Sequence, residues 1–381
     1  MAWARAIVVG GGIIGTSVAY FLAREGLEVF LLERSRLGDG ASGACEGLLL
    51  VQSKKPGLHL LMALRSIAMY PQLIEDIGVD VEWERRGALF VATEAADLEG
   101  LVELARQQQA AGIEAVILDR EEVLRAEPAL GSCVCGGCLT VDDAQLNPFK
   151  VIYGLAQALV RMGGRVWVGC EVEGVRVCGD RVTGVYTSRG VLGADLVVNA
   201  AGVAAAGLVR RLGITLPIRP RRGQVMVTEA VAPLIRRPVV EAAYARLKFS
   251  RGAEGTPRVS LVLEQTRRGN LLLGSTREFV GCDRRSTHQG ASAIARRATL
   301  ILPSLSRASI IRIYAGLRPH TPDGLPIIDW VGPQGLVVAA GHEGDGVTLA
   351  PLTGRLVADL VTGRRPAVPM DRLRADRFSH T

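Results

Sequence analysis

The sequence predicts an α/β fold, α+β overall, in which two domains are interleaved along the chain. Two observations lead to this prediction. Residues 6–33 indicate a strand, a helix and a second strand, the unit from which doubly wound parallel sheets are built. Residues 216–280 indicate successive strands instead, the pattern of a mixed or antiparallel sheet. A chain of 381 residues is long enough to give both parts a substantial core.

The N-terminal unit carries a glycine pattern with a specific chemistry. Gly10, Gly12 and Gly15 follow the buried strand 6–9 in the spacing G-x-G-x-x-G and open the helix 13–24. The first glycine permits the tight turn, the second lets the backbone approach a pyrophosphate, and the third lets the helix pack closely on the strand. Because the first N–H groups of the helix then face the phosphates, the pattern predicts dinucleotide binding.

Glu33 ends the second strand, residues 27–32. A carboxylate at this position can accept hydrogen bonds from both hydroxyls of an adenosine ribose. It would repel the 2′-phosphate of NADP, so the acid argues against that cofactor.

The same stretch has a competing interpretation as a membrane helix or a signal peptide. Residues 6–23 carry no charge, and Arg5 precedes them. Three consecutive glycines interrupt this helix, however, and no A-x-A cleavage site follows. We therefore expect a soluble, cytoplasmic protein with no transmembrane segment.

Composition limits the classes of partner. The chain has 45 basic and 38 acidic residues, a formal charge of +7. The basic residues are dispersed, apart from Arg219–Arg222 and the last fifteen or so residues, and few aromatic residues lie among them. This pattern argues against nucleic-acid binding. It fits attraction of anionic substrates or of an acidic partner subunit.

The seven cysteines are expected to be reduced thiols, because their number is odd and no secretion signal accompanies them. Cys133, Cys135 and Cys138 form a C-x-C-x-x-C cluster, which could hold a metal or an iron–sulfur centre. The fourth ligand would then come from a distant residue, Cys170, Cys178 or Cys282. We favour the simpler interpretation, small apolar residues in a glycine-rich strand region, and predict no metal site.

The remaining elements follow from periodicity and from turn residues. Helical periodicity predicts helices at 58–78, 95–112, 119–127, 149–162, 286–302 and 347–362. Pro128 ends one of these helices, and the turn before Phe149 opens another. Alternation and glycine turns predict strands at 112–118, 165–177, 181–187, 191–198, 216–227, 259–263, 270–276 and 336–340, and two strands within 82–93 that turn at Arg86-Gly87.

A second glycine-rich loop lies near the C-terminus. Residues 341–346, G-H-E-G-D-G, follow the strand 336–340 and open the helix 347–362. One helix N-terminus would serve the pyrophosphate. The second would serve another site where negative charge develops.

Several motifs together resemble the FAD-dependent glycine and D-amino-acid oxidase superfamily over essentially the whole chain. They are G-G-G-I-I-G at 10–15, G-A-S-G at 40–43, N-A-A-G at 199–202, R-P-R-R-G-Q at 219–224, E-Q-T at 264–266, G-L-R-P-H-T-P-D-G at 316–324 and G-H-E-G-D-G at 341–346. The resemblance implies a discontinuous Rossmann-like FAD-binding domain, residues 1–85, 150–215 and 315–381. It also implies a substrate-binding domain with a mixed or antiparallel sheet, residues 86–149 and 216–314. The implied reaction is oxidation of an amine C–N bond by hydride transfer to flavin N5.

The resemblance also implies, by position, which residues hold FAD. They are Gly10, Gly12, Ile13, Ile14, Gly15, Glu33, Arg34, Ala41, Ser42, Gly47, Leu48, Val172, Ala200, Ala201, Gly202, Arg318, Gly341, His342, Gly344, Asp345, Gly346, Val347 and Thr348. The segment 341–348 would lie beside the flavin pyrimidine.

Four residues are candidates for substrate contact or catalysis. Arg318 matches the arginine that grips the substrate carboxylate in the family, or else forms a surface or inter-domain salt bridge. His342 is either a pH-sensitive neighbour of the substrate, a flavin-orienting donor or a packed histidine. Glu264 and Gln265 are either contacts to the substrate amine or exposed strand residues. Tyr244 and Lys55 are further candidates.

The sequence differs from particular branches of this superfamily at three positions. Gly344-Asp345 replaces an arginine of the glycine oxidases, which weakens the case for a two-arginine carboxylate clamp. Leu272 stands where sarcosine oxidases carry a lysine that promotes oxygen attack. Gly316–Arg318 replace the cysteine that binds FAD covalently, so we expect non-covalent FAD.

The closing motif, with residues 264–281 and 52–57, looks most like one branch of the family, the catalytic β subunits of multi-subunit dehydrogenases. That branch comprises D-hydroxyproline dehydrogenase, hydrogen cyanide synthase, opine oxidase and proline dehydrogenase complexes. It implies a proline-like amino acid or glycine as substrate. It also implies partner subunits with iron–sulfur or additional flavin centres, through which any membrane association would arise. Two alternatives stay open, a self-sufficient glycine or sarcosine oxidase that makes hydrogen peroxide, and a non-catalytic FAD electron-transfer subunit.

Overall fold

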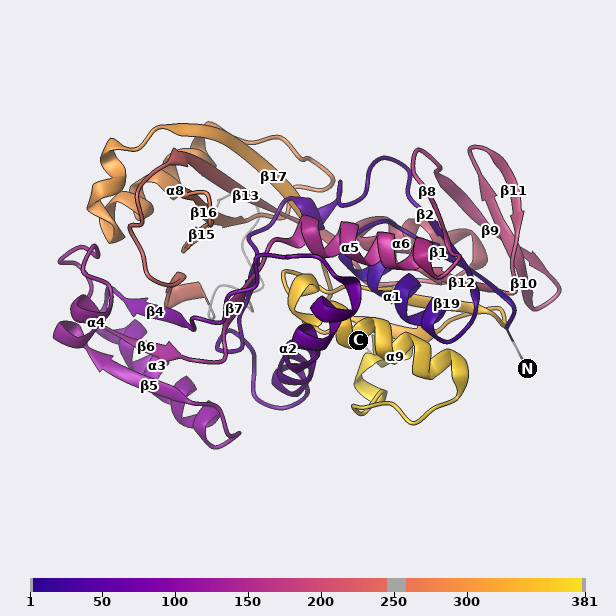
Figure 1. Ribbon diagram of the computed structural model, residues 1–381, viewed down its shortest axis with the longest axis horizontal. Helices are drawn as coiled ribbons and strands as arrows, with labels where there is room; N and C mark the ends of the chain where they lie inside the picture. The colour runs from indigo at the N-terminus through magenta and orange to yellow at the C-terminus, as the bar shows by residue number, and fades with distance from the viewer. Residues whose placement is uncertain (1–2, 245–257, 379–381) are drawn as a thin grey trace.

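Six strands form the sheet that carries the N-terminal glycine motif, in a computed structural model that describes residues 3–244 and 258–378 (Figure 1). Their order is β18-β19-β12-β1-β2-β8, and all neighbours are parallel except β18 and β19. The strands are β1 (Arg5–Val9), β2 (Glu28–Leu32), β8 (Arg165–Trp167), β12 (Leu196–Asn199), β18 (Ile327–Trp330) and β19 (Leu336–Ala340). A parallel centre with one antiparallel edge strand confirms the predicted α/β class.

Helices cover one face of this sheet and a small sheet covers the other. The helices are α1 (Ile13–Arg24), α2 (Leu58–Ile77), α5 (Pro148–Arg161) and α9 (Gly346–Thr362). Their buried side chains share a core with one face of β1, whereas Ile7 and Val9 point into the core on the opposite face. That face packs on the three-stranded sheet β9 (Val172–Cys178), β10 (Arg181–Thr187) and β11 (Gly190–Gly193), and on α6 (Ala205–Val209).

The second large sheet has eight strands in the order β17-β13-β16-β15-β14-β4-β6-β5. They are β4 (Ala88–Ala92), β5 (Ala115–Asp119), β6 (Gly136–Thr140), β13 (Arg219–Ala230), β14 (Val239–Glu241), β15 (Arg258–Gln265), β16 (Asn270–Arg277) and β17 (Ile310–His320). In β4, Leu89 and Val91 enter the core beneath α4 (Arg120–Ala126) and α8 (His288–Ile301), and the alternate residues enter a core with α3 (Ala95–Gln109). This alternation places helices on both faces of the sheet.

The two large sheets lie toward opposite ends of the long axis of the molecule, and α2 lies between them in the view of Figure 1, with α9 beneath the six-stranded sheet. The smaller elements are β3 (Leu48–Leu49) with β7 (Ala144–Gln145), and 3-10 helices at Ala41–Gly43, Gly202–Ala204, Arg210–Leu212, Pro303–Arg307, Asp371–Leu373 and Ala375–Phe378. Because the chain crosses between the two parts several times, residues far apart in sequence meet where the parts join.

Three predicted strands differ from the structure. The segment 165–177 is two strands, because Gly169 turns the backbone with φ +61° and the chain moves from the six-stranded to the three-stranded sheet. The segment 191–198 likewise divides into β11 and β12. Within 82–93 only β4 is a strand, and Glu84 makes an isolated bridge to Gln145. β17 was not predicted, and it crosses the predicted domain boundary at residue 315.

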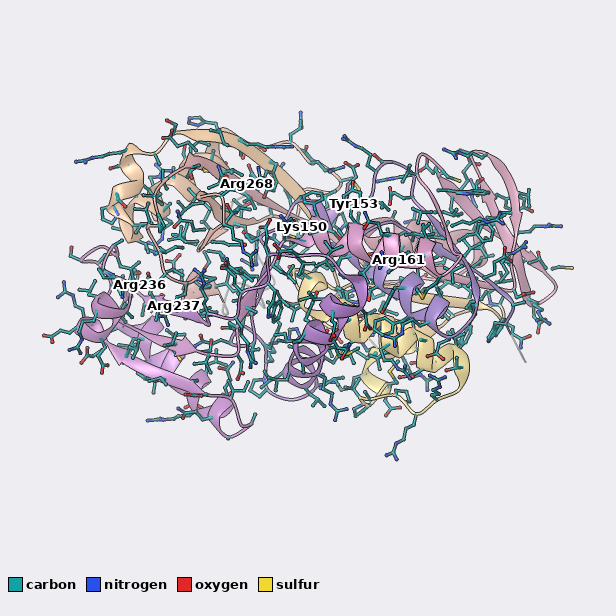
Figure 2. The ribbon with its side chains drawn as sticks, in the orientation of Figure 1. Lys150, Tyr153, Arg161, Arg236, Arg237 and Arg268 are labelled. Carbon is teal, nitrogen blue, oxygen red and sulfur yellow. The ribbon has the colours of Figure 1, made fainter. Side chains whose placement is uncertain are left out.

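Side chains on the outer surface are of mixed character. Figure 2 shows Lys150, Tyr153 and Arg161 along α5, well separated from Arg236 and Arg237. Lys150 pairs with Glu82 at 3.0 Å. Over the described ranges, no helix has both the length and the apolar character that a membrane crossing requires.

Candidate active site

A cavity of about 500 Å³ extends from the β1–α1 turn to the start of α9 and to β13 and β17 of the eight-stranded sheet. Its size lies within the range of cofactor and ligand sites. The predicted site residues that line it are Gly10, Gly12, Ile13, Ile14, Glu33, Arg34, Ala41, Ser42, Leu48, Val172, Ala200, Ala201, Gly202, Arg318, His342, Gly344, Asp345, Gly346, Val347 and Thr348. Residues from seven separated stretches of sequence therefore face one space.

Three predicted glycines lie behind the cavity wall and keep its backbone close-packed. A Cβ atom on Gly15 would lie 1.8 Å from the carbonyl oxygen of Gly10. A Cβ atom on Gly47 would lie 1.8 Å from the carbonyl oxygen of Leu146. Gly341 has φ +84°, and a Cβ there would lie 2.6 Å from Cγ2 of Thr321. These positions shape the site without facing a ligand.

The turn before α1 is shaped as the glycine pattern predicts. Gly10 adopts φ +109°, and a Cβ atom on it would meet the carbonyl oxygen of Ala200 at 2.6 Å. The N-cap residue of α1, Gly12, has no side chain to satisfy the first N–H groups. Ser42 reaches across instead, and its Oγ accepts a hydrogen bond from the Ile13 N–H at 3.0 Å. Backbone donors and a positive dipole end are thus aimed at the cavity.

Glu33 lines the cavity and also holds the turn in shape. Its Oε2 accepts from the Gly11 N–H at 2.7 Å, and its Oε1 accepts from the Ser35 N–H at 2.9 Å. Each carboxylate oxygen can accept more than one hydrogen bond. Ribose binding by Glu33 stays a prediction, compatible with this arrangement.

The start of α9 is fixed by a buried cluster of charges that the sequence did not reveal. The Asp345 carboxylate accepts from the Lys54 ammonium at 2.7 Å and contacts Nε2 of His59 at 2.9 Å. All three side chains are buried, and Lys54 also donates to Oγ of Ser53 at 3.0 Å. Lys54 and Asp345 line the cavity themselves. The loop before α9 is therefore tied to the segment before α2.

His342 is a buried cavity residue with a neutral ring. Its Nε2 lies 3.0 Å from Oγ1 of Thr353, within α9. Burial lowers the pKa of His342 to about 3, and the charge of Asp345 acts in the opposite direction. A ring that stays neutral across the physiological range is not a pH-sensitive group, so the packed and hydrogen-bonded alternatives fit best.

Arg318 reaches the cavity from β17. Its Nη1 donates to the carbonyl oxygen of Thr276 at 3.0 Å, and its Nη2 donates to Oγ of Ser275 at 2.8 Å. The guanidinium lies over Gly223, where a Cβ atom would approach Nη1 to 2.1 Å. In residues 3–244 and 258–378, no carboxylate pairs with Arg318, so the predicted alternative of an inter-domain salt bridge finds no partner there.

The two predicted amine contacts on β15 do not line the cavity. Glu264 is buried outside the cavity lining, and its Oε2 accepts a hydrogen bond from the Gly47 N–H at 2.8 Å. Burial raises the pKa of Glu264 to about 8. Gln265 contacts the loop that contains Leu234, and its Oε1 accepts a hydrogen bond from the Leu234 N–H at 2.8 Å. Since neither carboxylate nor amide faces the cavity, these residues hold backbone in place.

Glu46 is a further acid that lines the cavity. No motif in the sequence indicates this residue, beyond its place between the small-residue loop and β3. Its Oε1 is buried and has no hydrogen-bond partner among the described residues. A Cβ atom on Gly274 would lie 1.9 Å from Oε1 of Glu46. Glycine at position 274 therefore leaves room for the carboxylate.

The cysteine cluster forms no metal centre in the described part of the chain. Cys133 and Cys135 donate through Sγ to the carbonyl oxygens of Leu300 and Ala92, both at 3.3 Å, and Cys138 is buried in strand β6. Within the described ranges, no group of three histidine, cysteine or acidic side chains is arranged to hold a metal ion.

The motif order and the cavity agree with a comparison against known families. A family model described as FAD dependent oxidoreductase matches residues 5–360. The chain belongs to this family. Glycine oxidase from Geobacillus kaustophilus is 31% identical over 369 residues, which cover 94% of this chain and 93% of the relative. Hydrogen cyanide synthase subunit HcnC from Pseudomonas aeruginosa is 29% identical over 410 residues, which cover 96% and 93%.

Solved structures give the same result. The crystal structure of glycine oxidase from Geobacillus kaustophilus matches with a TM-score of 0.89 and 29% identity, covering 98% of this chain and 99% of that one. The crystal structure of L-proline dehydrogenase from P. horikoshii matches with a TM-score of 0.88 and 25% identity, covering 99% and 98%. The predicted membership of this FAD-dependent superfamily is confirmed.

The residues present fit the FAD of an FAD-dependent oxidoreductase. The Gly10–Gly15 turn is a cradle that Cβ atoms would fill, and Gly12 would bring a Cβ to 3.0 Å from Oγ of Ser42. Two helices, α1 and α9, begin at the cavity with no side-chain cap from their own N-cap residues. One helix start suits the pyrophosphate, and the other suits the ring that takes up electrons.

Proposed function

We propose that this oxidoreductase oxidises the C–N bond of an amino acid whose carboxylate is held by Arg318. One observation carries the proposal. The Arg318 guanidinium reaches the cavity, is held by two neutral oxygens and has no acidic partner among the described residues. A guanidinium that keeps its charge for a ligand suits a carboxylate, whose geometry matches its fork of donors. The names of the relatives, glycine oxidase and L-proline dehydrogenase, support an amino acid as substrate.

Glu46 is proposed to receive the amine. Its carboxylate lines the cavity, and one of its oxygens has no protein donor among the described residues. Burying an unsatisfied carboxylate oxygen is unfavourable, and a substrate ammonium would satisfy it. Arg318 and Glu46 would then fix opposite ends of a zwitterion and orient the carbon between them.

The start of α9 is proposed to complete the site. When bound, FAD supplies the acceptor for the two electrons that C–N oxidation releases. The N-terminal dipole of α9 favours negative charge nearby, and the neutral His342 adds no positive charge of its own. We assign residues 1–85, 150–215 and 315–381 to the FAD-binding domain, and 86–149 and 216–314 to the substrate-binding domain. β17 bridges the two.

Two forms of this function are considered, and they differ in the electron acceptor: partner subunits or oxygen. We propose a catalytic subunit that passes electrons to partner subunits in the cytoplasm, since HcnC is named as a subunit of hydrogen cyanide synthase. The self-sufficient oxidase has one observation in its favour. A lysine in the cavity provides a positive charge for oxygen reduction, and Lys54 lines this cavity although Leu272 occupies the position expected for such a lysine.

An anaerobic titration tests the proposal. Glycine, sarcosine, D- and L-proline, hydroxyprolines and an opine are added to the FAD-loaded protein, and the absorption of the oxidised flavin is followed. We expect bleaching by at least one amino acid. Arg318→Gln should raise the half-saturating concentration roughly 100-fold, because a charge-assisted pair is lost. An Arg318→Gln protein that retains FAD and bleaches at the wild-type concentration would contradict the proposal.

Admitting air then decides between the two versions. Rapid return of the flavin absorption with formation of hydrogen peroxide would make the protein an oxidase. A flavin that stays reduced until an artificial acceptor is added supports the partner-subunit version. For the titration of Arg318→Gln, the matched control is Arg312→Gln, because Arg312 is an exposed arginine of the same strand, β17, and lies outside the cavity lining.

A further inference from the structure

Three arginines lie on one face of three adjacent strands. Arg318 of β17 and Arg221 of β13 are directly opposite each other in the antiparallel register. Arg277 of β16 lies two residues after Ser275, whose Oγ accepts from Arg318. Alternate residues of a strand share a face, and two residues span about 7 Å, so Arg277 and Ser275 point to the same side. Of the three, Arg318 lines the cavity, whereas Arg221 and Arg277 lie on the same face of the sheet just outside the lining residues.

Arg277 is the unusual member of this cluster. It is only 6% exposed, and its Nε, Nη1 and Nη2 have no hydrogen-bond partner in the described part of the chain. Its guanidinium lies over the ring of Tyr244, 4.3 Å from the ring centroid, and Tyr244 lines the cavity. The ring face stabilises part of the charge, but it satisfies none of the N–H donors in the way an anion would.

The counter-charges are unevenly distributed. Arg221 pairs with Glu343 at 3.4 Å, whereas neither Arg318 nor Arg277 has a carboxylate partner among the described residues. On the opposite face of β13 the pattern is different. Arg222 is buried there with two carboxylates, Glu278 at 2.7 Å and Asp283 at 3.2 Å. Within the described ranges, Arg222 on one face of β13 and Arg221 on the other have acidic partners, whereas Arg318 and Arg277 have none.

The three charges also act on one another. Burial, the largest cause, lowers the pKa of Arg221 to about 10, and the charges of Arg277 and Arg318 act in the same direction. A buried charge without a partner is strongly unfavourable. An anionic ligand would relieve both the repulsion and the unmet donors.

We propose that the substrate is an amino acid with a second carboxylate, which Arg277 binds beside Tyr244 while Arg318 binds the first. This assignment rests on the proposed oxidation of an amino acid, and it favours dicarboxylic substrates over glycine and proline. Two guanidinium groups that have no acidic partner among the described residues match two carboxylates, and Glu46 takes the single amine. The second carboxylate is carried on the amine nitrogen or on the side chain, and matched substrates distinguish these cases.

The test compares substrate pairs that differ by one carboxylate. Sarcosine and iminodiacetate differ on the nitrogen, and alanine and aspartate, each as both enantiomers, differ on the side chain. Values of kcat/KM are measured with an artificial acceptor for the FAD-loaded wild type, Arg277→Gln, Arg277→Lys and the control Arg312→Gln. Arg312 is a matched control because its guanidinium also contacts a tyrosine ring, Tyr314 at 5.7 Å, but is exposed.

We expect the wild type to prefer the diacid of one pair by roughly 10- to 100-fold, the effect of a charge-assisted hydrogen-bonded pair. Arg277→Gln should lose this preference and keep its kcat/KM for the monoacid. Arg277→Lys should restore part of it, and Arg312→Gln should behave as wild type. Equal kcat/KM for monoacid and diacid in wild type and Arg277→Gln would overturn the inference.

A binding measurement separates this inference from the proposed function. Succinate and acetate, which have no amine, are titrated while the flavin absorption spectrum is followed. Succinate should bind to the wild type at least 10-fold more tightly than acetate, and Arg277→Gln should remove the difference. If this pattern holds while no amino acid reduces the flavin, the second anion site stands and the amino-acid oxidation is wrong. If succinate has no advantage, Arg277 has a structural role only. Arg277→Lys keeps the test valid should Arg277→Gln fail to fold.

Discussion

The ion cluster at the start of α9 gives the sharpest test of how the fold holds the site. Replacing Asp345 with asparagine keeps the shape of the side chain but removes the charge between Lys54 and His59. The Lys54 ammonium, 1% exposed and 2.7 Å from Oδ1 of Asp345, would then lose this carboxylate. The variant therefore isolates the electrostatic part of the contact.

The magnitude follows from the distance. At 2.7 Å and an effective dielectric constant of about 20, the attraction is ~6 kcal/mol. Desolvation of the two groups offsets part of this, and removing one partner of a buried pair costs about 3–5 kcal/mol. We expect Asp345→Asn to lower the free energy of unfolding by that amount. The double variant Lys54→Met with Asp345→Asn should return to within about 2 kcal/mol of the wild type, because both members of this ion pair are then neutral.

The assay is urea unfolding followed by tryptophan fluorescence, at one fixed concentration of FAD, since bound cofactor adds to the apparent stability. Asp76→Asn is the control. Its carboxylate also lies 2.7 Å from a cation, Arg24, but the pair is exposed at 50% and 24%, so the expected loss is about 0–1 kcal/mol. The reasoning is refuted if Asp345→Asn costs no more than the control, or if the double variant loses the sum of the two single losses.

Three further predictions concern the nucleotide turn and a buried acid. Gly10→Ala should abolish or strongly weaken FAD binding, because Gly10 has φ +109° and the new Cβ would lie 2.6 Å from the carbonyl oxygen of Ala200. The loss of binding is measured by the fluorescence of released FAD. Ser42→Ala should cost about 0.5–2 kcal/mol of stability, because the Ile13 N–H loses its acceptor at the start of α1; urea unfolding measures it. Glu264→Gln should change the pH dependence of stability. Burial raises the pKa of Glu264 from 4.5 to about 8, so the folded protein binds more protons than the unfolded chain between these values, and stability falls as pH rises through this window. The variant should lose this slope, about 1.4 kcal/mol per pH unit.

Each of the three has a distinct contradicting result. An unchanged FAD affinity of Gly10→Ala would mean that the turn tolerates a side chain. A Ser42→Ala protein as stable as the wild type would mean that Ile13 finds another acceptor. For Glu264, parallel pH profiles of variant and wild type between pH 5 and 8 would show that the carboxyl is ionised in the folded protein.

Local sequence determined the parts of the site that depend on backbone alone. The spacing of Gly10, Gly12 and Gly15 requires a tight turn and close packing whatever surrounds it, so both the turn and the start of α1 could be predicted. The same holds for the loop 341–346, where glycines before an apolar helix indicate a helix N-terminus. Alternation likewise predicted β10, whose bounds match the expected 181–187.

Other elements escaped prediction because their pattern is set by tertiary contacts. β17 begins with exposed apolar side chains, Ile310, Ile311 and Ile313, and ends in the motif of Arg318, so its pattern does not alternate cleanly. It is a strand because it pairs along its length with β13. The cofactor and the family could be predicted from the sequence, because whole motifs, and not single residues, indicate them.

The charged interior of the site was decided by the tertiary structure. Lys54 and Asp345 are 291 residues apart, and nothing in either neighbourhood indicates that they meet. Glu46 faces the cavity and Glu264 does not, because Gly274 leaves room for one carboxylate while the Gly47 N–H holds the other behind the wall. Short-range patterns fix backbone conformation, but the partner of a buried charge depends on which distant strands and helices pack against it. The sequence by itself therefore determined the nucleotide turn and the family, and only the packed structure decided which buried charges pair with one another.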